Sequence, residues 1–412
     1  MADTSIKWFV FTNKDAPVLD NSWGCMIPLL DACLVNGFGA QTSQSYEVKD
    51  GVGKITFLET HSIQQFQVID VSGASEPTLN GEFKVLGVTG STIEFLVTAS
   101  DAMISTPVTV KLASLGWAKE FEGSGKAVYR AKDLASNPYY LRVDGSQSAA
   151  ALSTGLKFSK VGILETCSGI DDISSVNQGP FDAQKNWVPS GTGSTAYDGW
   201  AKWYNATDAT SARSSIQPGS AATEGNRTWI LIGNKDTFYI IPSYTSLSAT
   251  EANTFYGVPY GFGVTEKFNI PFLASHLNYH QRGAGGITGG INCPLAFNNS
   301  EYSVEGSFIL MKNRLGMPNQ TYNNVDFGFG DNTPGRINRF LETDDSMNYT
   351  QIYTVDNQGF FAGTLPLVFA PQKSNIAFTA HYQIYSEYNN KFLLKKNIGF
   401  NSNYGSLLFK IM

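Results

Sequence analysis

Short alternations of apolar and polar residues recur along most of the chain, a pattern typical of β-strands joined by tight turns. Residues 7–12 form the first such run. Turn signals at Asp50-Gly51, Ser72-Gly73-Ala74 and Asn80-Gly81 separate the next six, which are residues 46–48, 54–58, 66–71, 81–88, 92–97 and 108–112. Several short strands with regular turns predict a small β-barrel over residues 41–113.

One segment before this barrel has a helical pattern. Residues 26–34 carry a broad apolar face, Asn21-Ser22 can cap a helix start, and Pro28 is tolerated in a first turn. Gly37 can take the left-handed conformation that ends a helix. We expect a short helix that ends at Gly37 and packs against strands, within an N-terminal strand and helix unit of residues 1–40.

A larger β region is expected over residues 114–412, with long loops. Its clearest signal is a hairpin of residues 229–232 and 237–241 around a turn at residues 233–236; both runs are apolar throughout, which indicates a central position. Other expected strands are residues 139–143, 304–310, 367–369, 376–385 and 407–411, and long polar stretches cover residues 178–198 and 207–224. The predicted fold class is mainly β: a small β-barrel inserted after the strand-helix unit, plus a larger β-sandwich-like domain.

Composition narrows the class of partner. Charged residues are 16% of the 412 and the net charge is −6, so we expect no nucleic-acid partner. Lys391, Lys395 and Lys396 flank apolar residues, which predicts an exposed strand edge guarded by lysines. No export signal and no run of 18 apolar residues is visible, so we expect no membrane partner, and Cys25, Cys33, Cys167 and Cys293 are expected to be free thiols.

Two segments contain residue types found in metal or phosphate sites. His276 and His280 have the i,i+4 spacing that places two imidazoles on one helix face, but Leu277 stands where a metalloprotease helix has Glu, so packed imidazoles are the better interpretation. Residues 283–290 are rich in glycine, but no lysine and no helix start follows them. Tight turns or a loop explain this stretch better than a phosphate-binding site.

Three groups of acidic residues are candidates for catalysis or calcium binding. Asp171-Asp172 and Asp344-Asp345 are adjacent pairs, and neighbouring side chains on one strand point to opposite faces, so neither pair forms a glycosidase dyad by itself. Residues 326–332 have oxygen ligands without the full calcium-loop spacing. We therefore predict no catalytic, cofactor-binding or metal-binding residue, no cofactor, and no enzymatic activity.

The barrel segment carries a family resemblance. Its pieces are Thr60-His61-Ser62, the stretches at residues 68–74 and 79–85, and Thr92-Ile93-Glu94-Phe95. Together they resemble the first catalytic cysteine half-domain of ubiquitin-activating enzymes, a fold that recurs in bacteriophage structural proteins. No cysteine lies between His61 and Phe95, so the resemblance does not extend to ubiquitin chemistry.

A wider stretch resembles structural proteins of tailed phages and prophages. The matching pieces run in order at residues 29–39, 121–133, 139–144, 198–204 and 227–239. The resemblance implies a virion protein that assembles in the host cytoplasm, with the major capsid protein or tail proteins as partners. Head-surface decoration as a homotrimer is the expected role. A tail, baseplate or neck component that binds host glycan and a virion carbohydrate-active enzyme are the alternatives.

Overall fold

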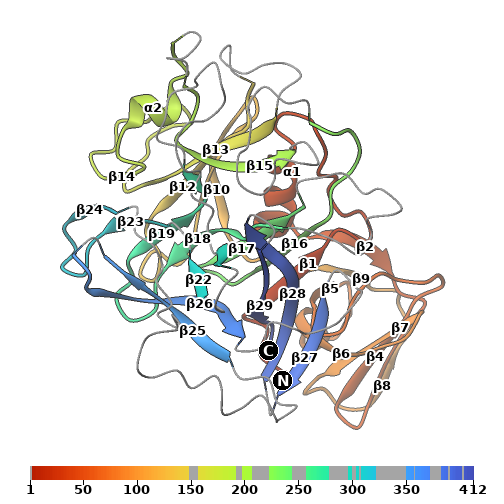
Figure 1. Cartoon of the computed structure of the whole chain (residues 1–412). Helices are drawn as coiled ribbons and strands as arrows, with labels where there is room; N and C mark the ends of the chain where they lie inside the picture. Colours follow the sequence, from red (N-terminus) through yellow and green to blue (C-terminus); the bar gives the residue numbers. More distant parts are fainter. Residues whose placement is uncertain are drawn as a thin grey trace.

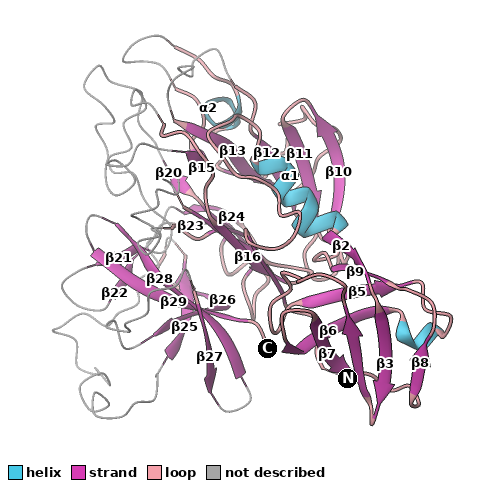
Figure 2. Ribbon diagram, turned by 90° about the vertical axis from the view of Figure 1, so that its right-hand side faces the viewer, coloured by secondary structure: helices cyan, strands magenta, loops and turns pink. Residues whose placement is uncertain are grey.

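The structure is a computed structural model. It describes residues 2–147, 156–191, 197–206, 222–243, 257–277, 296–298, 303–305, 308–321, 349–356, 358–371, 382–387, 390–400 and 403–412. Antiparallel sheets dominate it, and the helices are short (Figures 1 and 2). The prediction of a mainly β fold is confirmed. The predicted small β-barrel is a curled half-barrel, and the sheets of the larger part are consistent with the predicted sandwich-like arrangement.

A seven-stranded sheet forms the centre of the larger part. Its strands, in spatial order, are β1 (Lys7–Val10), β16 (Trp229–Gly233), β17 (Phe238–Pro242), β18 (Tyr260–Val264), β19 (Pro271–Ala274), β23 (Phe308–Lys312) and β24 (Pro318–Thr321). Alternate residues enter different cores: Leu231 lies in one hydrophobic cluster and Ile230 and Ile232 in another. The expected central hairpin is confirmed, because β16 pairs with β17 and each has a further neighbour.

A second sheet covers one face of this central sheet. It contains β10 (Ala118–Gly123), β11 (Lys126–Arg130), β12 (Tyr140–Asp144), β13 (Lys157–Leu164), β15 (Ala201–Ala206) and β20 (His276–Leu277), while β14 (Gln178–Gly179) pairs with β13 and is followed by α2 (Ala183–Trp187). Trp203 joins the two layers, since its ring contacts Phe238 and stacks on Tyr260. Its Nε1 also donates to the carbonyl of Ala274 on the central sheet at 2.9 Å.

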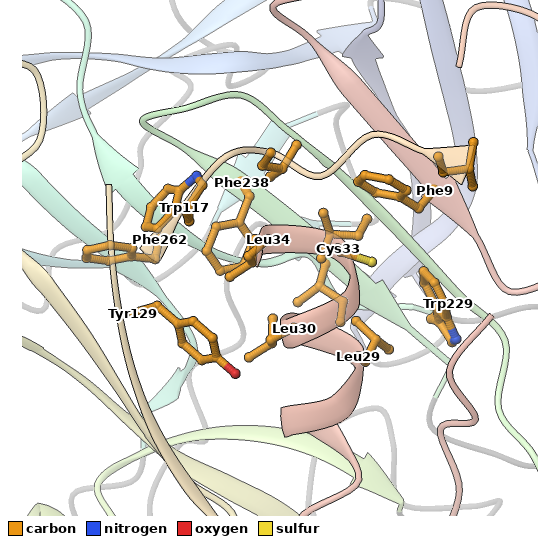
Figure 3. Close-up of a cluster of buried hydrophobic side chains, with 14 of the residues drawn as sticks. Phe9, Leu29, Leu30, Cys33, Leu34, Trp117, Tyr129, Trp229, Phe238 and Phe262 are labelled. Atoms are coloured by element: carbon orange, nitrogen blue, oxygen red, sulfur yellow. The ribbon is translucent and has the colours of Figure 1, made fainter. Parts of the chain in front are cut away.

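The only helix before the barrel is shorter than expected at its start. α1 is Met26–Leu30 and continues as the π-helix η1, Asp31–Asn36; Cys25 precedes it without a side-chain cap, so the predicted cap at residues 21–22 is wrong. Pro28 does lie in the first turn, and Gly37 ends the helix at φ 69°. Its apolar residues are buried between the sheets (Figure 3), as expected.

A third sheet covers the opposite face of the central sheet. It contains β25 (Tyr349–Val355), β26 (Phe361–Pro371), β29 (Asn403–Lys410), β28 (Asn390–Phe400) and β27 (Gln383–Glu387), and the pair β21 (Ala296–Asn298) and β22 (Ser303–Glu305) contacts it. Residues 392–394 of β28 pair with β27 on one side and β29 on the other, so the predicted strand edge is wrong for these residues. The pairing with β27 ends at Leu394, and among the described residues Lys395 and Lys396 pair with β29 alone.

The small sheet has eight strands and curls as a half-barrel (Figure 2). Its strands are β2 (Phe38–Thr42), β9 (Thr109–Leu112), β5 (Val68–Ser72), β6 (Gly81–Val88), β7 (Thr92–Leu96), β4 (Val52–Thr56), β3 (Ser45–Lys49) and β8 (Ala102–Ile104), with the 3-10 turn η2 (Pro77–Leu79) before β6. All six strands expected from the pattern are present. β2 and β8 are additional.

The first and last strands of the half-barrel lie beside each other. β2 pairs with β9, and Phe38 stands opposite Leu112. The segment that follows the half-barrel supplies hydrogen-bond donors to the C-terminal end of the helix. The N–H groups of Leu115 and Trp117 donate to the carbonyls of Cys33 and Leu34, both at 2.9 Å. The half-barrel is thus inserted at one narrow point.

A buried lysine ties the half-barrel to both ends of the described chain. Lys84 on β6 is 2% exposed, and its Nζ donates to the carbonyl of Ile6 at 2.7 Å and to that of Ile411 at 2.8 Å. Burial lowers the pKa of Lys84 to about 8. Strand β1, strand β29 and the half-barrel therefore meet at one ammonium group.

Candidate functional site

The structure places His276 in a setting that does not suit the helical metal pair. His276 lies on strand β20, not on a helix, and is 3% exposed. The N–H of Tyr204 donates to the hydroxyl of Tyr260, which lies 3.0 Å from His276 Nδ1. A hydrogen bond to the Tyr260 hydroxyl therefore engages Nδ1 within the core. Residue 280 lies outside the described residues.

This histidine gives the protein a defined acid sensitivity. Burial, followed by the nearby Lys202 charge, lowers the pKa of His276 from 6.5 to about 3. Between pH 6.5 and about 3, His276 is therefore protonated in the unfolded chain and neutral in the folded chain. The stabilisation is present above pH 6.5 and is lost as pH falls toward 3, at about 1.4 kcal/mol per pH unit within that window.

We expect His276→Gln to flatten this dependence. Urea unfolding of the wild type and the variant at pH 7, 6, 5 and 4 measures it. The slope of unfolding free energy against pH should be smaller in the variant by about 1.4 kcal/mol per pH unit, which corresponds to one proton. This difference in slope does not depend on the absolute stabilities of the two proteins. Equal slopes would show that His276 takes up its proton in the folded state.

The Asp171-Asp172 pair lies in a turn, so the strand geometry expected for it is wrong, and each carboxylate has a structural role. Asp171 pairs with Lys126 at 2.6 Å and with Arg142 at 3.5 Å. Asp172 accepts from the backbone and hydroxyl groups of Ser168 and Ser174, which hold the pKa of its carboxyl well below the usual range. These contacts close a turn and do not form an acid-base pair.

Two further carboxylates converge beneath this turn. Asp144 and Asp198 both approach Lys160 Nζ, at 3.5 and 3.6 Å, and Arg142 lies 3.6 Å from Asp144. Lys160 and Arg142 are almost completely buried. A glycosidase dyad needs one protonated and one free carboxylate across a cleft. The acids here neutralise buried cations instead.

The remaining sequence candidates fall outside the described residues. They are residues 283–290, residues 326–332 and the pair at 344–345, together with Cys293. Within the described ranges no three His, Cys, Asp or Glu side chains are grouped to hold a metal ion, and Cys25, Cys33 and Cys167 are free. No helix among these residues is long and apolar enough to cross a membrane.

The candidate site is instead a group of exposed apolar side chains on three hairpin ends. We name it the tip patch: Phe268 on the β18–β19 turn, Leu315 and Met317 on the β23–β24 turn, and Phe360 before β26. Their exposed fractions are 40, 73, 59 and 50%. Exposed residues of this size on adjacent turns form a surface suited to binding.

Side-chain contacts link the three turns that carry the tip patch. The Arg314 guanidinium lies 5.2 Å from the centre of the Phe360 ring, which joins the second and third turns. The rings of Phe268 and Phe361 are 5.8 Å apart, and Lys267 Nζ lies 5.5 Å from the Phe361 ring. The β23–β24 hairpin lies at the left-hand edge of Figure 1.

The base of the tip patch is held firmly. Thr265 is fully buried, and its hydroxyl donates to the carbonyl of Ala362 at 2.8 Å. The N–H of Glu266 donates to the carbonyl of Thr364, and the Thr364 hydroxyl donates to Glu266 Oε2. Gly363 makes this approach possible, since a Cβ there would lie 2.3 Å from the Glu266 carbonyl.

The sequence interpretation missed the tip patch, although a local signal was present. Residues 313–317 read Asn-Arg-Leu-Gly-Met and residues 356–360 read Asp-Asn-Gln-Gly-Phe. Each has an Asx residue, a glycine three positions later and then a large apolar residue. This pattern marks a tight turn that presents an apolar side chain.

Comparison of the sequence with protein-family models and with curated proteins finds no match.

Proposed function

We propose that this chain is a bacteriophage virion structural protein that acts by binding and assembly, with decoration of the head surface as its role. The observation that carries the proposal is the tip patch, a firmly held apolar surface on a β framework. The resemblance of residues 29–39 and of the later pieces to tailed-phage proteins supplies the setting. Low charge and many short strands agree with a protein that works as a rigid surface.

The proposal predicts that the chain is a component of purified particles. Mass spectrometry of gradient-purified particles should detect it at many copies per particle, and immunogold particles should label the head. Light scattering of the purified protein should give three chains per assembly. Absence from purified particles would overturn the proposal, and labelling confined to the tail would overturn head decoration alone.

Binding of host glycan by a tail, baseplate or neck component is the second candidate. The exposed rings of Phe268 and Phe360 favour it, because aromatic faces can stack on sugars. Glycan arrays with the purified protein test it: binding that disappears in Phe268→Ala and Phe360→Ala would support this role. The carbohydrate-active enzyme gains no support from Asp144, Asp171, Asp172 and Asp198, which are engaged in ion pairs and a turn.

A further inference from the structure

Two of the turns beneath the tip patch are built by the same hydrogen bonds. Asn313 Oδ1 accepts from the N–H groups of Leu315 and Met317 at 2.9 and 3.0 Å, and Asp356 Oδ1 accepts from those of Gln358 and Phe360 at 3.0 and 2.9 Å. In both turns the N–H of the first residue donates to the carbonyl of the fifth residue, and the N–H of the fourth residue donates to the carbonyl of the first. Gly316 and Gly359 take φ of 76° and 81° at equivalent positions.

This shared geometry fixes the exposed side chains before any partner binds. Asn313 and Asp356 are 8% and 1% exposed, so the groups that organise each turn are buried while Met317 and Phe360 remain exposed. A surface that is already ordered loses less conformational entropy when a partner binds, and its affinity for that partner is therefore higher. Two hairpins with the same construction therefore each present an exposed apolar residue at the fifth position of the turn, Met317 in one and Phe360 in the other.

The chemistry of the tip patch favours a protein over a glycan. Glycan sites combine aromatic faces with side chains that hydrogen-bond to hydroxyls. Here Asn313, Asp356 and Thr265 direct their oxygens into the turns themselves. The exposed groups include Phe, Leu and Met beside Arg314 and Lys267, together with the polar side chains of Glu266, Asn269 and Gln358. Phe, Met and Arg are enriched at protein interfaces, so the apolar share favours a protein partner.

We propose that the tip patch docks on an apolar surface of another virion protein that carries carboxylates opposite Arg314 and Lys267, with Asn313 and Asp356 as positioning residues. This inference rests on the proposed function. The exposed Arg314 and Lys267 supply the positive charge that such carboxylates would meet. Glu266 beside Lys267 keeps its own negative charge while it accepts a hydrogen bond from the Thr364 hydroxyl. The aliphatic and aromatic side chains of the tip patch would form the buried centre of the interface.

Incorporation of full-length variants into particles tests the inference. Met317→Asp and Arg314→Glu should each lower the number of copies per particle at least tenfold. Leu58→Asp is the matched control, because Leu58 is 80% exposed on the half-barrel, and it should incorporate like the wild type. Normal incorporation of both tip variants, with the wild type present in particles, would overturn the inference and leave the proposed function standing.

Exchange of the two Asx residues tests the positioning role. Asn313→Asp and Asp356→Asn keep an oxygen at the same place and should incorporate normally, whereas Asn313→Ala and Asp356→Ala should lose incorporation. Thermal unfolding of all four proteins separates this effect from loss of folding. If the alanine variants fold and incorporate like the wild type, the positioning role is wrong.

Photo-crosslinking identifies the partner class. A benzoylphenylalanine at position 360, activated in purified particles, should link the chain to one other virion protein, and the same group at position 58 should not. A link to polysaccharide or lipid in place of protein would overturn the partner class. Absence of the wild-type chain from particles would instead remove the proposed function on which the inference rests.

Discussion

Gly37→Ala is expected to reduce the unfolding free energy by about 3 to 5 kcal/mol. Gly37 has φ 69° and ψ 170°, a backbone region that is essentially restricted to glycine. A Cβ at this position would lie 2.3 Å from the carbonyl oxygen of Leu112, which is backbone on a neighbouring strand and cannot move aside alone. Both the strain and the clash therefore act against the folded state.

Gly116→Ala provides the control for this result. Gly116 also has a positive φ, 83°, but a Cβ there would meet no atom within 4 Å. Its expected cost is about 1 to 2 kcal/mol, from backbone strain alone. Urea unfolding of the three proteins measures the difference, and similar losses in both variants would contradict the clash with Leu112.

Trp117→Ala is expected to cost about 3 to 5 kcal/mol, the range for removal of a buried Trp or Phe ring. Trp117 is fully buried, and its ring makes edge contacts with Phe238 and Phe262 at 5.4 and 5.7 Å (Figure 3). Its Nε1 donates to the carbonyl of Asn234 at 2.9 Å. The alanine variant would leave a cavity between the helix and the central sheet.

Trp117→Phe separates packing from hydrogen bonding. The phenyl ring keeps most of the apolar contact but not the bond to Asn234, so we expect a loss of about 1 to 2 kcal/mol. Thermal and urea unfolding measure both variants. If Phe costs as much as Ala, the hydrogen bond and not the packed ring is the main contribution of Trp117.

The parts of the fold that follow from short-range patterns could be predicted. The hairpin of β16 and β17 is apolar on both faces, and only a strand with a core on each side requires that. The helix start could not be predicted in the same way, because Cys25 precedes α1 without a side-chain cap and no sequence signal marks it. β8 is three residues long and largely exposed, so it carries no alternation to detect.

Pairing between distant segments accounts for the other errors. Lysines around residues 392–394 resemble a guarded edge, but whether a strand is an edge depends on β27 and β29. The tip patch has the same character: Phe268, Met317 and Phe360 lie 49 and 43 residues apart in sequence, and only the sheets bring them together. The sequence contains a signal for each single turn, but it contains no signal that the turns lie next to one another in the fold.

The side-by-side placement of β2 and β9 has a consequence for how this protein can change. A segment whose two ends are neighbours can be exchanged or replaced without stretching the framework that receives it. Residues 38–112 occupy such a position, with Phe38 opposite Leu112. A foreign domain with closely spaced termini could be grafted there, provided that the contacts of Lys84 with Ile6 and Ile411 are replaced. The junction thus offers a site for recombination in nature and for display of cargo in the laboratory.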